Sequence, residues 1–205
     1  KDHPVNKSRI KRGERPANSI WIWGQGKKPQ LESFYDKYGV NGAVISAVDL
    51  LKGIGICAKM QVIEVEGATG NIHTNFMGKA KAALDALLGD RDFVYLHIEA
   101  PDECGHRYEV DNKVLAIERI DEVTKYIMDG LDAAGQDYSI LLMPDHPTPL
   151  ELRTHTKDPV PYVIYKSTEK ELIANRRYTE AEAGKTHNFC EIGHTLMDRF
   201  LEMRR

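Results

Sequence analysis

Histidine and aspartate side chains gather in three short segments of this 205-residue chain. The first segment holds Asp102 and, four residues later, His106. The second joins Asp145 to His146, and the third contains His155. Carboxylate oxygens and imidazole nitrogens bind divalent ions such as Mn, Zn, Co or Mg. Two carboxylates and three imidazoles suffice for two such ions, which together can hold the attacking and the leaving oxygen of a phosphoryl transfer.

Predicted strands accompany all three segments. Apolar runs at 93–99 and 138–143 precede the first two segments, and a further strand is expected at 161–165, shortly after the third. Earlier strands are expected at 19–23 and 43–47. Because sites in sheets of this kind collect in loops at the carboxyl ends of strands, we expect the five side chains to lie in loops at one edge.

Helical patterns alternate with these strands. Helices are expected at 31–38, at 78–88 and, most clearly, at 113–131, where apolar residues recur at helical spacing. Asn188 with Glu191 predicts a capping-box start for a last helix. The alternation predicts an α/β fold, a three-layer α/β/α sandwich with a mostly parallel sheet.

The N-terminal stretch differs in composition from the rest of the chain. Residues 1–18 are basic and are interrupted by proline and glycine, so we expect an irregular lead-in or hinge. Residues 19–205 are expected to form the metal-binding α/β domain.

Composition excludes several classes of partner. A formal net charge of -3 disfavours nucleic acid, and no apolar run approaches the roughly 20 residues that a membrane-spanning helix needs. The odd number and wide spacing of Cys57, Cys104 and Cys190 fit free thiols in a reducing compartment. We therefore expect a cytoplasmic location.

Short motifs over nearly the whole chain follow one known pattern. They occupy residues 17–18, 21–26, 42–53, 65–70, 99–103, 144–149 and 153–161. Together they resemble archaeal-type cofactor-independent (2,3-bisphosphoglycerate-independent) phosphoglycerate mutases of the alkaline phosphatase superfamily. The resemblance implies an alkaline-phosphatase-like core and an isomerase of glycolysis and gluconeogenesis. It also implies two divalent ions, manganese among the candidates, one bound by Asp102, His106 and His155 and the other by Asp145 and His146.

The sequence departs from that family at the nucleophile. Family members carry an aspartate for the second metal and a phosphoryl-accepting serine, both upstream of an inserted domain. No serine here stands in that context, and Ser46 lies inside a strand-like run. We therefore expect a C-terminal part whose sheet is incomplete on its N-terminal side, and which is inactive without the missing N-terminal part of the same polypeptide.

Three cationic residues are candidates for binding the phosphate or carboxylate of phosphoglycerate. They are Lys52, Arg153 and Arg9, and ordinary surface roles are the alternative for each. Two other functions stay open at this point. One is a different metal-dependent phosphotransferase or phosphatase of the same superfamily, and the other is a non-catalytic metal-binding module.

Overall fold

The computed structural model describes residues 2–22, 24–169 and 176–202. The chain forms two compact units, Lys1–Gln30 and Leu31–Arg205. The first unit contains helix α1 (Pro4–Lys11). The expectation of an irregular stretch at 1–18 is therefore wrong for eight of these residues. The physical reason is that proline in the first turn starts a helix without losing a hydrogen bond.

The strand expected at 19–23 is also wrong where it can be checked. Residues 19–22 have no regular secondary structure, and residue 23 lies outside the described residues. A strand needs a neighbouring strand to bind its backbone groups, and no described strand pairs with this segment.

The second unit is built around a parallel sheet. Strands β1 (Gly42–Ile45), β2 (Gln61–Val62) and β3 (Phe93–Leu96) pair in parallel, in the order β2-β1-β3. The predicted α/β fold with a parallel sheet is thus confirmed. Strands β4 (Ser139–Leu142) and β5 (Val163–Lys166) form a separate antiparallel pair, which the sequence pattern did not reveal.

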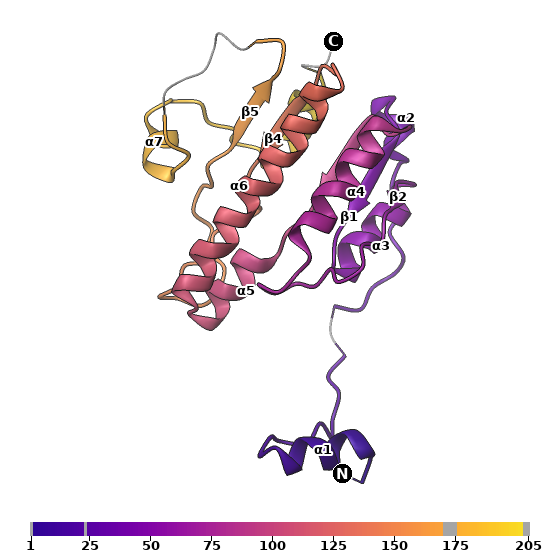
Figure 1. Cartoon of the computed structure of the whole chain (residues 1–205), viewed down its shortest axis with the longest axis vertical. Coiled ribbons are helices and arrows are strands. Elements are labelled where there is room, and N and C mark those ends of the chain that lie inside the picture. Colours follow the sequence, from indigo (N-terminus) through magenta and orange to yellow (C-terminus); the bar gives the residue numbers. More distant parts are fainter. Residues whose placement is uncertain (1, 23, 170–175, 203–205) are drawn as a thin grey trace. The chain divides into compact units, whose positions relative to one another are not determined.

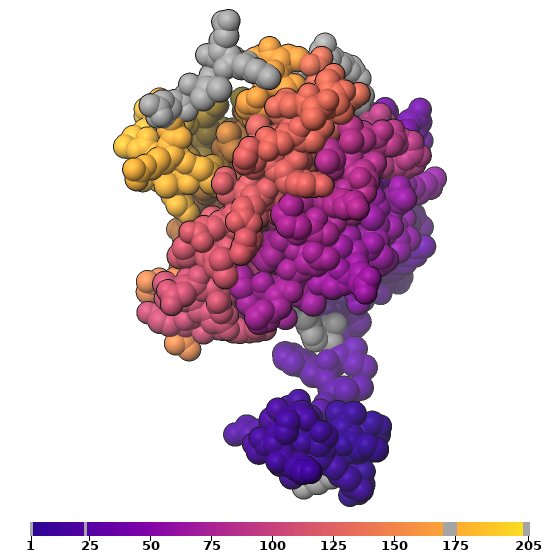
Figure 2. Space-filling model, viewed as in Figure 1, coloured from indigo at the N-terminus to yellow at the C-terminus, as the bar shows by residue number. Residues whose placement is uncertain are grey.

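The register of β1 and β3 shows which helices cover which face of the sheet. Val44 of β1 lies opposite Tyr95 of β3. The Val44 side chain faces helix α3 (Asp49–Cys57), which comes so close that a Cβ on Gly55 would lie 2.9 Å from it. Phe93, on the same face, stacks on Phe34 of helix α2 (Phe34–Tyr38). The opposite face is covered by α4 (Phe76–Leu88) and α6 (Val110–Ala133), which lie side by side in Figures 1 and 2. These helices supply the two outer layers of the sandwich.

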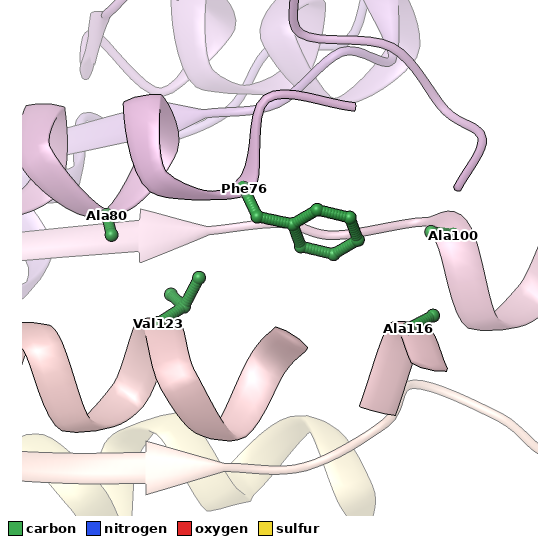
Figure 3. Packing of buried hydrophobic residues seen from close by; sticks show 5 residues of the cluster. All are labelled: Phe76, Ala80, Ala100, Ala116 and Val123. Atoms are coloured by element: carbon green, nitrogen blue, oxygen red, sulfur yellow. The ribbon is translucent and has the colours of Figure 1, made fainter. Parts of the chain in front are cut away.

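Small residues let α4 and α6 approach β3 closely. The buried cluster on this side contains Phe76, Ala80, Ala100, Ala116 and Val123, which Figure 3 shows between the helices and the strand. Ala100 begins the helix that follows β3, so the cluster also anchors the segment that carries Asp102.

Replacing Phe76 with alanine is expected to lower the free energy of unfolding by about 3–5 kcal/mol, because the neighbouring alanines cannot fill the cavity. Urea denaturation measures this loss. Met77→Ala is the matched control, because Met77 is 43% exposed and should cost about 0.5 kcal/mol or less. Equal losses for the two variants would contradict the central place of this cluster.

The C-terminal part holds the short helices α7 (Glu180–Gly184) and α8 (Leu196–Glu202), with a 3₁₀ turn at Gly193–Thr195. The helix start predicted at Asn188 is wrong, because local hydrogen bonds hold this stretch in turns. The Thr186 hydroxyl accepts from the Asn188 N–H, and the Thr195 hydroxyl donates to the Ile192 carbonyl.

Within the described residues, no helix combines the length and apolar character that crossing a bilayer requires.

Candidate metal centre

Asp102 and His106 lie on one face of helix α5 (Ala100–Arg107), which directly follows β3. Sequence reasoning expected both in a loop, and this was wrong because Pro101 is already at the start of a helix. The spacing of four residues brings the two side chains together, with Asp102 Oδ2 3.3 Å from His106 Nε2. Asp102 is in the first turn, where the helix dipole favours a negative charge.

His155 is brought back to α5 by a closed loop. The carbonyl of Pro149 accepts from the N–H of Arg153 at 2.9 Å, and the carbonyl of Pro147 accepts from the N–H of Thr156 at 3.1 Å. Arg153 has φ 53, in the left-handed region that few non-glycine residues occupy. The turn places His155 Nε2 3.1 Å from His106 Nε2 and 3.3 Å from Asp102 Oδ1.

These three separations match the geometry of a bound ion. Ligand bonds of about 2.0–2.2 Å in a tetrahedral arrangement place neighbouring ligand atoms about 3.3–3.6 Å apart. The separations of 3.1, 3.3 and 3.3 Å among Asp102, His106 and His155 are close to that range. The side chains of Asp102, His106 and His155 are 25%, 35% and 50% exposed, respectively, so an ion can reach them from solvent.

A backbone contact fixes the orientation of His106. Its Nδ1 lies 2.9 Å from the carbonyl oxygen of Arg153, which can only accept a hydrogen bond. Nδ1 must therefore carry the proton, and the lone pair of Nε2 points at His155 and Asp102. Ligand histidines in metal sites are held in this way. When Nε2 of His155 is also unprotonated, two imidazole nitrogens and the Asp102 carboxylate are available to one divalent ion, so the residues fit such an ion.

The second pair of predicted ligands lies beside the first group. The His146 ring is 3.7 Å from the His155 ring, and His146 Nε2 is 3.4 Å from Asp145 Oδ2. His146 also offers a nitrogen within 4.8 Å of ligand atoms of Asp102 and His155. The structure thus brings all five predicted ligands into one neighbourhood, while their division between two ions rests on the family resemblance.

The surroundings of the group carry negative charge. Carboxylate oxygens of Glu99, Asp102 and Glu103 lie within 4.8 Å of one another. Burial, followed by the charges of Glu103 and Asp102, raises the pKa of Glu99. Like charges this close destabilise each other, so a cation in their midst would be stabilising.

Two lysines are bound to the backbone next to the ligands. Lys79 of α4 is fully buried and donates to the carbonyl of His97, which follows β3. Lys113 of α6 donates to the carbonyl of Thr148 at 2.6 Å. Burial lowers the pKa of both ammonium groups, and nearby carboxylates, Glu99 for Lys79 and Asp102 for Lys113, act in the opposite direction. Neither lysine was singled out from the sequence, because their roles depend on contacts 18 and 35 residues away.

The predicted substrate-binding cations are placed differently from one another. Lys52 lies on α3, and its ammonium is 2.7 Å from a carboxylate oxygen of Glu64. The guanidinium of Arg153 is 5.0 Å from the centre of the Tyr108 ring. Arg9 belongs to the first unit, where it forms an ion pair of 3.3 Å with Glu14. Of the three cations, only Arg153 contacts a predicted ligand among the described residues, through its backbone carbonyl and His106. Lys52 and Arg9 are instead paired with the carboxylates of Glu64 and Glu14.

Ser46 does not offer an accessible nucleophile. Its side chain is buried, its oxygen accepts from the N–H of Val48 at 3.0 Å, and it lies 3.2 Å from Nδ1 of His97. Burial lowers the pKa of His97, which favours a neutral ring in this contact.

Gly105 permits the close approach of α5 to the Thr148 loop. A Cβ at this position would lie 2.6 Å from the Thr148 carbonyl oxygen and 2.9 Å from Lys113 Nζ. Gly105→Ala is expected to push the ligand loops apart, cost about 1–3 kcal/mol of stability and weaken divalent-ion binding at least about tenfold.

Isothermal titration with Zn²⁺ and thermal unfolding measure these two effects of Gly105→Ala. The control is Gly53→Ala in helix α3, where a Cβ would meet nothing within 4 Å. That variant should keep its ion affinity and gain up to about 1 kcal/mol of stability. Unchanged ion affinity in Gly105→Ala would show that ion binding does not depend on the close approach of α5 to the Thr148 loop.

The carboxylates and imidazoles that converge from helix α5 and from the segment between β4 and β5 are ligand types of metal-dependent enzymes, and the chain belongs to the Metalloenzyme superfamily. The family model of the Metalloenzyme superfamily matches residues 1–203. The predicted kinship with phosphoglycerate mutases is confirmed by its relatives. The 2,3-bisphosphoglycerate-independent phosphoglycerate mutase of Methanothrix thermoacetophila is 56% identical over 164 residues, covering 80% of this chain and 42% of that protein. A probable enzyme of the same name from Geobacter sulfurreducens is 50% identical over 202 residues, covering 98% of this chain and 50% of that protein.

Two solved structures resemble the chain in fold. The PH0037 protein from Pyrococcus horikoshii has a TM-score of 0.71 and 38% identity, covering 90% of this chain and 48% of that one. A cofactor-independent phosphoglycerate mutase from Thermoplasma acidophilum has a TM-score of 0.57 at 24% identity, covering 98% of this chain and 47% of that one, a likeness that shows the fold alone. The chain thus spans about half the length of the relatives it matches.

Proposed function

We propose that this chain is the metal-binding part of a cofactor-independent phosphoglycerate mutase, which interconverts 3-phosphoglycerate and 2-phosphoglycerate in glycolysis and gluconeogenesis. The observation that carries the proposal is the convergence of Asp102, His106 and His155 at separations suited to one divalent ion. The names of the relatives supply the reaction. The remaining half of the polypeptide would supply the serine that takes up the phosphoryl group.

The chain's own residues would hold two ions. Asp102, His106 and His155 would form one site, and Asp145 with His146 would provide part of the second. Bound there, divalent ions supply positive charge that activates a hydroxyl and stabilises the transferring phosphoryl group. Imidazole with carboxylate suits Mn, Zn or Co better than Mg, which prefers oxygen ligands alone.

Cationic side chains would bind the substrate's phosphate and carboxylate. Arg153 is the candidate nearest the ligands along the chain, since its carbonyl already contacts His106. To bind substrate, Lys52 would have to leave its ion pair with Glu64, and Arg9 would have to leave its ion pair with Glu14.

The proposal also includes a role for residues 1–18 as a hinge towards the other half of the polypeptide. It includes a cytoplasmic location, which the three free cysteines support.

An assay of the full-length polypeptide tests the reaction. We expect conversion of 3-phosphoglycerate to 2-phosphoglycerate that stops when a chelator removes the ions. Release of inorganic phosphate from 3-phosphoglycerate, with no 2-phosphoglycerate formed, would instead identify a phosphatase on the same scaffold. Tight ion binding with neither reaction would point to a non-catalytic metal-binding module.

A further inference from the structure

The hydroxyl of Thr148 contacts two predicted metal ligands, Asp102 and His146. Thr148 is buried, and its Oγ1 forms a hydrogen bond with Oδ1 of Asp102. The same oxygen is 3.3 Å from Nδ1 of His146. Asp102 belongs to the first predicted ion and His146 to the second, so one side chain contacts a ligand of each.

The directions of these hydrogen bonds follow from counting protons. A hydroxyl has a single proton to donate, and a carboxylate can only accept. The Thr148 proton is therefore used by Asp102, so that the Thr148 oxygen accepts from Nδ1 of His146. His146 must then carry its proton on Nδ1, which leaves the lone pair of Nε2 free. That nitrogen lies 3.4 Å from Asp145 Oδ2, close to the separation expected of two ligands of one ion.

The backbone of Thr148 is held as firmly as its side chain. Lys113 donates to its carbonyl at 2.6 Å, and Gly105 leaves the room that this approach needs. The hydroxyl is thus fixed relative to both α5 and α6. A group fixed in this way can orient ligands without moving when an ion binds.

We propose that Thr148 is a positioning residue that sets the ligand atoms of both metal positions, selecting the Nδ1–H form of His146 and the orientation of the Asp102 carboxylate. This inference rests on the proposed function, since it concerns the ions of that site. Loss of a hydrogen-bond partner behind a metal ligand typically costs 10–100-fold in ion affinity. Thr148→Val keeps the shape and removes both hydrogen bonds, whereas Thr148→Ser keeps the hydroxyl.

Two measurements on the whole chain test the proposal. Long-range ¹H–¹⁵N NMR of the histidine rings without added metal, at a pH where they are neutral, should show His146 protonated on Nδ1 in wild type and in Thr148→Ser. Thr148→Val should lose this preference. Titration with Zn²⁺ should show affinity about 10–100-fold weaker for Thr148→Val and within about threefold of wild type for Thr148→Ser. Thr168→Val, an exposed threonine changed in the same way, should match wild type in both.

The outcomes separate this inference from the proposed function. A wild-type tautomer and wild-type affinity in Thr148→Val would overturn the role of Thr148. If the wild-type chain binds no divalent ion, the proposed function fails, and the NMR comparison still decides whether Thr148 sets the His146 tautomer. Equal weakening in Thr148→Ser and Thr148→Val would show a purely steric role and would also overturn the proposal.

Discussion

Asp102→Asn is expected to abolish tight binding of a divalent ion to this chain, with an affinity loss of at least about a hundredfold. Asp102 is the one carboxylate within 3.3 Å of both His106 and His155 among the described residues. The substitution keeps the size of the side chain and removes the negative charge. The loss should exceed the 10–100-fold typical of a residue that only supports a ligand.

Thermal unfolding provides a second measurement of the same effect. An ion present at 100 times its dissociation constant stabilises a folded chain by about 2.7 kcal/mol, or several degrees in Tm. Wild-type protein should show this rise with Zn²⁺ or Mn²⁺ and lose it with a chelator, while Asp102→Asn should show none. Asp121→Asn on the exposed side of α6 is the control and should respond as wild type. A full rise in Tm for Asp102→Asn would remove Asp102 from the site.

Elements with a strong local pattern could be predicted from the sequence. Helix α4 was expected at 78–88 and begins only two residues earlier, where the Asn75 side chain accepts from the N–H of Gly78. Helix α6 was expected at 113–131 from apolar residues at helical spacing, of which Val123 and Leu131 are buried while Val114 and Ile117 are exposed, and it extends over Val110–Ala133. Strands β1 and β3 were recognised as apolar runs. Burial imposes these patterns, so they are visible without the structure.

Features that depend on distant partners could not be predicted. The antiparallel pairing of β4 with β5 is set by contacts across the chain, and nothing in either strand's own residues specifies it. The roles of Thr148 and of the Arg153 carbonyl were missed for the same reason. Thr148 lies two residues after His146 in the motif that contains the predicted ligands Asp145 and His146. The hydrogen bond of its hydroxyl with Asp102, 46 residues away, forms only in the folded chain. A backbone carbonyl carries no sequence signal at all.

The isolated chain is expected to lack mutase activity, with turnover lower than that of the full-length enzyme by on the order of 10⁶-fold, as when a nucleophile is removed. The mechanism that we propose divides one phosphoryl transfer into two through a serine. Ser46, the most buried serine among the described residues, is 3% exposed and hydrogen-bonded, and the chain spans about half the length of its relatives. The measurement is conversion of 3-phosphoglycerate by purified chain across a series of metals, beside the full-length enzyme.

Adding the other half of the polypeptide as a separate protein distinguishes a missing nucleophile from a misfolded chain. If the two halves share one site, the mixture should regain activity, because α5 and the loop between β4 and β5 already bring together the predicted ligands of one ion. The same mixture made with Asp102→Asn should stay inactive, and the mixture with Asp121→Asn should be active. Turnover by the chain alone within tenfold of the full-length enzyme would mean that a serine of this chain is the nucleophile. Ser46 would then be the residue to replace first, because its hydroxyl lies 3.2 Å from His97, the nearest imidazole base to any serine in the described part of the chain.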